Sequence, residues 1–154
     1  MSSSISQDIL GSVDDLQNLL SSYNSLLEGT AVNEPNKIEL AALGTILHSF
    51  YNGIEGVFLL VAKHIDQNVP TGHAWHQSLL NSMTETTKMR PPLILPETAD
   101  SLAAYLKFRH YFRHAYAFML NWKQMEPLVI GLLPIWGTVK NELIAFASSV
   151  QTTN

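Results

Sequence analysis

The sequence predicts an all-α fold, an antiparallel bundle of four or five helices. Apolar residues recur at three-to-four-residue spacing almost throughout, and no segment shows the sustained alternation of apolar and polar residues that a strand requires. Short connections separate these segments, which favours antiparallel neighbours. With 154 residues, of which 46% are hydrophobic, the chain is long enough for one core and short for two. We therefore expect a single domain over residues 1–154.

The first half of the chain predicts two helices. One is expected from about residue 6 to 28, because its apolar residues form a single stripe and Gly29 follows as a stop signal. Pro35 and Asn36 then restart the chain. A second, long helix is expected to reach about Asp66, and its middle is apolar on both faces, which predicts burial on both sides.

Prolines mark the connections in the second half. The segment QNVPTGHAW is turn material, and a third helix is expected from Trp75 to Met83. The double proline of RPPLILPE cannot continue a helix, so this stretch predicts a rigid, extended loop. A fourth helix is expected to begin at Glu97 and to run through Met119.

A last helix is expected to reach about Val150. The stretch NWKQMEP separates it from the fourth helix in this interpretation, with Asn121 as a candidate N-cap. Pro134 is expected to kink the helix. The sequence contains no internal repeat that would indicate a solenoid.

Composition restricts the setting of the protein. There is no cysteine, so neither disulfides nor thiolate zinc sites can form. The first residues lack the basic start and apolar run of a signal peptide. The longest apolar run, PLVIGLLPIWG, contains two prolines and is shorter than the roughly 20 residues of a membrane span. These features favour a soluble, cytoplasmic protein with no membrane partner.

Charge is distributed unevenly along the chain. The formal net charge of -4 argues against broad, non-specific binding to nucleic acid, which depends on Lys and Arg neutralising phosphates. From Ser101 to Met125, however, there is no Asp or Glu. This window contains four of the nine Lys and Arg and two histidines: Lys107, Arg109, His110, Arg113, His114 and Lys123. The positive field is therefore expected to be local.

The densest part of this window is the stretch FRHYFRHAY. A helix turns about 100° per residue, which separates its side chains into two flanks. One flank carries the cations and a tyrosine: Arg109, His110, Arg113, His114 and Tyr116. The opposite flank is apolar and is expected to pack into the bundle: Phe108, Phe112, Ala115 and Met119.

Arginine and histidine together suit chemistry on a phosphodiester. Arginine keeps its proton and presents a planar fork to phosphate oxygens, whereas histidine moves a proton near neutral pH. A base for the ribose 2′-hydroxyl, an acid for the leaving 5′-oxygen and cations around the phosphorus are sufficient for RNA cleavage without a metal. Arg109, His110 and His114 could supply that set. The ordinary alternative is that these residues form only a solvated helical face.

The motif also carries a family resemblance. Arg109, His114 and Tyr116 have the spacing R-x4-H-x-Y, and the segments YNGIEGVFLLVAK, GHAWHQSLLNSM and LKFRHYFRHAYAFMLNW occur with it in order. This pattern resembles the HepT-like ribonuclease toxins of the HEPN superfamily over about residues 40–146. The resemblance implies a homodimeric helical bundle in which the motif helices of two subunits meet at a basic cleft. It leaves the helix over about 6–28 as an extra N-terminal element.

The resemblance also implies roles for individual residues. Arg109 would stabilise the transition-state phosphate, His114 would be the general base or acid, and His110 would fill the polar position beside the arginine. The product would be a 2′,3′-cyclic phosphate, with neither cofactor nor metal involved. Expected RNA contacts are Arg113, Lys107 and Lys123, and an ion-pair role stays open for Arg113.

The same resemblance also implies a protein partner. HepT-like toxins pair with an antitoxin, a nucleotidyltransferase of the MNT type, which is similar to proteins that transfer AMP onto the tyrosine of the motif. Here that residue is Tyr116, whose alternative role is packing at the dimer seam. The alternative function is a non-catalytic HEPN binding module, which uses the cationic flank to hold a nucleotidyltransferase or a nucleotide and cuts no RNA.

Three other patterns are weaker candidates. His73 and His76 have a spacing usable by zinc, but no carboxylate or cysteine lies close in sequence, so a role at the helix start is favoured. His48 and Glu55 are two helical turns apart and could line one cleft, with a satisfied interhelical hydrogen bond as the ordinary interpretation. The glycines of YNGIEG lie inside a helix pattern, so close approach of another helix is expected there.

Overall fold

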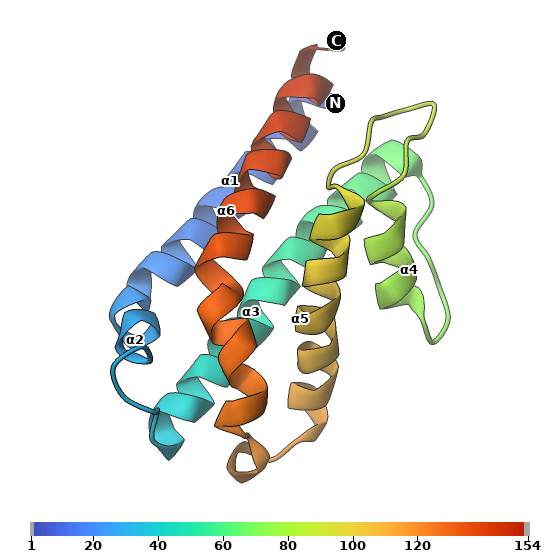
Figure 1. Ribbon diagram of the computed structural model, residues 1–154. Coiled ribbons are helices and arrows are strands. Elements are labelled where there is room, and N and C mark those ends of the chain that lie inside the picture. Colours follow the sequence, from blue (N-terminus) through green and yellow to red (C-terminus); the bar gives the residue numbers. More distant parts are fainter. Residues whose placement is uncertain (1, 153–154) are drawn as a thin grey trace.

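The computed structural model describes residues 2–152, and within this range the chain forms six α-helices and no strand (Figure 1). The predicted all-α bundle is confirmed. The helices are α1 (Ser2–Ser22), α2 (Asn24–Gly29), α3 (Lys37–Val61), α4 (Trp75–Ser82), α5 (Pro96–His114) and α6 (Trp122–Thr152).

Helix α3 is the centre of the bundle and contacts each of the other helices. It begins where the sequence predicted, because Asn36 and Glu39 form a capping box in which each side chain accepts the other's backbone N–H, at 2.8 and 2.9 Å. Its buried residues extend around most of the helix, although Asn52 and Gly56 remain exposed. A π-helical turn, Ala62–Asp66, completes it.

Helix α1 packs along α6 and α3, so the N-terminal segment is part of the core (Figure 1). Its buried apolar stripe consists of Ile5, Ile9, Val13, Leu16 and Leu20. Near the N-terminus of α1 and the C-terminus of α6, the Ser6 hydroxyl donates to the Ala147 carbonyl at 2.9 Å. The prediction of one helix over 6–28 was wrong in one respect, because Tyr23 interrupts it and α2 follows. The polar run around this break has low helix propensity, while Leu27 of α2 still reaches the core.

A buried arginine fixes the loop between α4 and α5. The Arg90 guanidinium donates from Nε and Nη2 to the two carboxylate oxygens of Asp66, at 2.8 and 2.9 Å. It also donates to three backbone carbonyls, those of Ser82, Glu85 and Pro91. The loop is therefore tied to the end of α3, in agreement with the rigid segment that the double proline predicted.

Helix α5 is shorter than the sequence predicted, because it ends at His114 and Ala115 adopts an extended conformation. The physical reason lies in Leu120. A helix continued to that residue would place it on the same flank as Arg109, facing solvent. The break instead buries Leu120 against α3, and Met119, which was expected to pack inward, is 46% exposed in a short 3-10 turn, Ala117–Met119.

A glycine makes room for this arrangement. A Cβ on Gly44 of α3 would lie 2.7 Å from Cε1 of Phe112 and 3.2 Å from Cδ1 of Leu120. Gly53 has the same role toward α1, because a Cβ there would lie 2.6 Å from Leu16 Cδ2. Close helix approach is thus confirmed for Gly53 and was wrong for Gly56, where a Cβ would meet nothing within 4 Å.

The last helix begins earlier than expected. WKQMEP is the first part of α6 and not a separate connection, because Trp122 is already helical. Asn121 is confirmed as the N-cap, since its Oδ1 accepts from the Gln124 backbone N–H at 3.2 Å. Pro127 and Pro134 lie inside the helix without ending it.

Two helical stretches, Lys37–Asp66 and Trp122–Val150, are long and apolar enough to cross a membrane by length and composition alone. The first is the core helix, with 56% of its most apolar window buried in the bundle, and a core helix passes the same test. The second has 28% of that window buried, and Ile130 and Leu133 are among its exposed side chains.

Candidate functional site

An open groove of about 500 Å³ lies between α5 and the start of α4. It is lined by His73, Ala74, His76, Gln77, Ala103, Leu106, Lys107, Arg109, His110 and Arg113. None of these lining residues is acidic, whereas three are permanent cations and three are histidines. The groove therefore suits an anion, and a phosphate group matches the donors of arginine and lysine.

The sequence builds this groove by helical periodicity. Ala103, Leu106, His110 and Arg113 recur every three or four residues of α5, so they lie along one edge of the helix. Leu106 is buried and Ala103 is half-buried, which gives the groove an apolar floor. The cations further along α5 remain more exposed, so their charges are available to a ligand.

Arg109 is held from the neighbouring core helix. Its Nε donates to Oδ1 of Asn52 on α3. The Asn52 amide nitrogen in turn lies 3.3 Å from Nδ1 of His48, one helical turn earlier. This asparagine was missed in the sequence, although its place between His48 and Glu55 on one face of the helix was a usable signal.

His48 lies close to the cations of α5. Its ring packs on Phe112 with centroids 5.3 Å apart. Partial burial lowers the pKa of His48, and the charges of Arg109 and Arg113 lower it further. The imidazole is therefore neutral at neutral pH, so it adds no positive charge to the region.

Glu55 pairs with α4 and not with the histidine of its own helix. Of the two interpretations weighed from the sequence, the interhelical hydrogen bond is confirmed for Glu55, because its Oε2 lies 2.8 Å from Nδ1 of His76. Glu55 is only 5% exposed, while His76 reaches the groove. The hydrogen bond joins α3 to α4 directly beneath the cationic lining.

His73 and His76, whose spacing is usable by zinc, are not joined by a third ligand in the part of the chain that the structure describes. Within residues 2–152, no group of three His, Cys, Asp or Glu is placed to hold a metal ion. His76 is instead engaged by Glu55, and its ring stacks on Trp75 at a centroid distance of 3.6 Å. Trp75 is partly buried against the core, so it supports the imidazole from one side.

The remaining predicted site residues are divided between the groove and its surroundings. His114 ends α5 and does not line the groove, but its ring lies 4.9 Å from that of His110, which does. Lys123 is exposed near the start of α6, outside the lining. The groove therefore brings together only part of the predicted set.

Tyr116 lies outside the helix on which it was expected. It follows the end of α5 in extended conformation, so its predicted place beside Arg109 on a helical flank was wrong. The residue is 70% exposed, and its ring stacks on Phe118, which is 74% exposed, at 5.7 Å. The phenol is therefore accessible to another protein.

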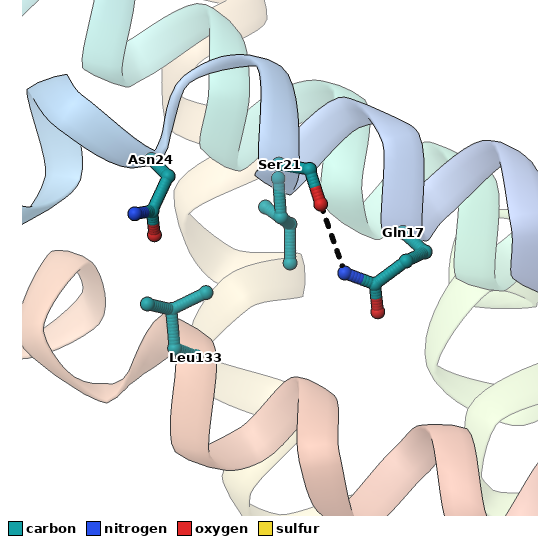
Figure 2. Close-up of a pocket in the computed structure, with 5 residues that line it drawn as sticks. Gln17, Ser21, Asn24 and Leu133 are labelled. Atoms are coloured by element: carbon teal, nitrogen blue, oxygen red, sulfur yellow. Dashed lines mark hydrogen bonds between the residues drawn. The ribbon is translucent and has the colours of Figure 1, made fainter.

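A second hollow, of about 230 Å³, lies between the end of α1 and α6 (Figure 2). Its labelled residues are Gln17, Ser21, Asn24 and Leu133, and the Gln17 amide donates to the Ser21 hydroxyl at 3.0 Å (Figure 2). None of the residues that line it is charged. The groove between α4 and α5 is the better candidate for a charged ligand.

Comparison with known proteins identifies the family of the chain. The model of a family described as HepT-like protein matches residues 42–150, which contain the whole groove. No curated protein and no solved structure matches the chain.

Proposed function

Because the chain belongs to the HepT-like family, we propose that it is a cytoplasmic, metal-independent endoribonuclease, the toxin of a pair whose antitoxin is an MNT-type nucleotidyltransferase. The observation that carries this proposal is the groove between α4 and α5, in which Arg109 and His110 of the motif line a surface with no acidic residue. An RNA backbone is the anion proposed for it, with phosphates held by Lys107 and Arg113.

The proposed reaction needs only proton transfer and charge stabilisation. The ribose O2′ attacks the phosphorus, its proton passes to a base, the bond from phosphorus to O5′ breaks, and O5′ takes a proton from an acid. Arg109 stabilises the extra negative charge on the phosphoryl oxygens, with His110 beside it. His114 is one of the two proton-transfer groups. The products are a 2′,3′-cyclic phosphate and a 5′-hydroxyl.

A homodimer is part of the proposal, because His114 lies outside the groove lining of its own subunit. The segment after α5 exposes three apolar side chains, Tyr116, Phe118 and Met119. A second copy packed there would cover them and would add a second motif helix to the cleft. Sedimentation of the wild type against Phe118→Ser tests this, with a dimer expected for the wild type and a weaker one for the variant. A monomeric wild type would contradict it.

The proposed antitoxin acts on Tyr116. The phenol oxygen attacks the α-phosphorus of ATP, the phenolic proton is lost and pyrophosphate leaves. Exposure of the side chain supports such a modification, and the bulky anionic adduct would repel RNA from the nearby cations. Intact mass after incubation with the nucleotidyltransferase and ATP should increase by one AMP in the wild type and not in Tyr116→Phe. Modification of the Phe variant would exclude this residue as the target.

The alternative function is a non-catalytic module that binds a nucleotide or the nucleotidyltransferase. One observation favours it: a single subunit places Arg109 and Lys107 in the groove without His114, which provides phosphate binding but an incomplete catalytic set. Such a module would bind oligonucleotides with a steep salt dependence and leave them intact.

The deciding experiment is RNA cleavage in excess EDTA by unmodified protein. We expect fragments ending in cyclic phosphate, and we expect Arg109→Ala and His114→Ala to abolish them while remaining folded. Lys63→Ala, an exposed cation outside the groove, is the matched control and should cut normally. Equal cleavage by both motif variants would indicate a contaminating nuclease. Intact RNA with the wild type would favour the binding module.

A further inference from the structure

The Glu55–His76 pair lies outside the Arg-x4-His motif, yet it opens on the same groove as Arg109 and His110. Its carboxylate is almost fully buried beneath the groove, and its imidazole is partly exposed in the lining. A buried carboxylate that touches a histidine at the edge of a cationic cleft is the arrangement by which enzymes orient a proton-transfer group.

The hydrogen bond selects the tautomer of His76. An ionised carboxylate only accepts, so with Glu55 ionised the contact of 2.8 Å places a proton on Nδ1. In the neutral ring, the lone pair is then on Nε2, the nitrogen that Glu55 does not engage. His76 is thereby prepared to accept a proton from a ligand in the groove, and the carboxylate stabilises the imidazolium that results.

The surroundings of the pair are consistent with this direction of transfer. Stacking on Trp75 fixes the plane of the His76 ring. Burial raises the pKa of the Tyr51 hydroxyl, and the neighbouring Glu55 carboxylate raises it further, so the phenol stays protonated beside the pair. The other titratable or charged groups that line the groove are His73, Lys107, Arg109, His110 and Arg113. Lys107, Arg109 and Arg113 attract an anion, and of the three histidines in the lining His76 is the one that a carboxylate orients.

We propose that His76 is a catalytic residue of this groove, the general base that removes the 2′-hydroxyl proton, and that Glu55 is its positioning residue. This rests on the proposed ribonuclease function. The proton moves from O2′ to Nε2 of His76 as the bond from O2′ to phosphorus forms. The bond from phosphorus to O5′ breaks, and the leaving oxygen takes its proton from His114, which is then the acid.

Two substitutions separate catalysis from a merely structural link between α3 and α4. His76→Asn keeps a nitrogen donor in the place of Nδ1 and removes Nε2, so the hydrogen bond to Glu55 survives without the base. We expect the melting temperature to stay near that of the wild type and kcat for RNA cleavage to fall about 100-fold or more, with little change in KM. His64→Asn, an exposed histidine outside the groove, is the matched control and should keep full activity.

Glu55→Gln tests the positioning residue. The amide oxygen can still accept from Nδ1, but the negative charge is lost. We expect a lower kcat, and we expect the acidic limb of the profile of kcat/KM against pH to move to lower pH, because the imidazolium loses its stabilising charge. A structural link alone would leave that limb in place.

The outcomes distinguish this inference from the function on which it rests. If the wild type cuts RNA and folded His76→Asn cuts equally well, His76 is not the base and the ribonuclease proposal stands. If the wild type cuts no RNA, the proposed function and the base role fail together. Nitrogen NMR of the imidazole is a readout besides activity, and a proton on Nε2 of His76 in place of Nδ1 would overturn the tautomer on which the role depends.

Discussion

The guanidinium of Arg109 donates through Nε to the side-chain oxygen of Asn52, a residue 57 positions earlier on the core helix. This hydrogen bond joins the motif helix to α3 at the groove. It leaves the Nη nitrogens of the arginine as the donors for a phosphate. The orientation of the arginine therefore depends on a residue outside the motif.

Under the proposed ribonuclease function, Asn52→Ala should weaken RNA cleavage without unfolding the protein. Loss of the acceptor frees the Arg109 side chain to adopt other rotamers, so less of the fork is in place when the phosphate develops charge. We expect kcat to fall about 10-fold, because a hydrogen bond to a charged group contributes about 1.5 kcal/mol or more. Thr45→Ala, an exposed position on the same helix, is the control. Unchanged kcat in Asn52→Ala would show that Arg109 is oriented by the substrate alone.

Arg90→Ala should be strongly destabilising. Its side chain is 1% exposed and forms two hydrogen bonds to Asp66, so its removal leaves that carboxylate without its partner. We expect a loss of about 3 kcal/mol, a fall in melting temperature of roughly 10 °C for a chain of this size. Lys88→Ala, two residues earlier in the loop and exposed, should change stability by less than about 0.5 kcal/mol. Equal melting temperatures for the two variants would contradict this.

Alanine at two glycines of α3 should have opposite effects. Gly44→Ala places a methyl group 2.7 Å from the Phe112 ring, and we expect it to destabilise the protein by about 1–3 kcal/mol. Gly56→Ala meets open space, and we expect it to stabilise the helix by about 0.5–1 kcal/mol through reduced backbone entropy in the unfolded state. Urea unfolding at constant m-value measures both. A stabilising Gly44→Ala would mean that Phe112 and Leu120 move aside freely.

Stability should fall as the pH drops below the ordinary range of His48. Its folded pKa is lowered from 6.5, chiefly by burial and then by Arg109 and Arg113, so below pH 6.5 the unfolded chain binds a proton that the folded chain resists. The contribution is complete above 6.5 and is lost as the pH falls toward the folded pKa. Comparing urea unfolding at about pH 5.5 and about pH 7.5, we expect a smaller loss for His48→Gln than for the wild type.

The control for the pH experiment is an exposed histidine. His64→Gln should retain the pH dependence of the wild type, because His64 lies on the surface of the π-helical turn. In Arg109→Ala, proton NMR should show the pKa of His48 moving upward toward 6.5, since one of the charges that lower it is gone. An identical pH dependence for wild type and His48→Gln would assign the loss of stability to other groups.

The sequence was sufficient for the helical elements but not for their ends. Apolar periodicity identified the helices, and Asn36 and Asn121 were correct as N-caps, because periodicity and caps are local properties; the residues after Asn121 were nevertheless expected to be a connection, although α6 begins there. The early end of α5 was not local. The end of α5 depends on the burial of Leu120 against Gly44, a contact between residues 76 positions apart.

The site, like the helices, was predictable only where it depends on local sequence. The cations of α5 form a cluster in the sequence, so helical spacing placed Arg109, His110 and Arg113 on one flank of the helix, but not the α4 residues that complete the groove. Asn52 and the Glu55–His76 pair were not identified, because each contact joins two helices and depends on their packing. The spacing of His48 and Glu55 indicated a shared face of α3 and an interhelical hydrogen bond, but it did not identify His76 as the partner of Glu55.

Helix α1 determines which part of the chain unfolds as one unit. The family match begins at residue 42, after α1 and α2, yet the α1 side chains are buried in the same core as the matched segment. The slowest amide hydrogens of α1 should therefore exchange together with those of α3, through global opening alone. A chain cut back to the matched residues would expose an apolar face on α3 and α6, so it should aggregate.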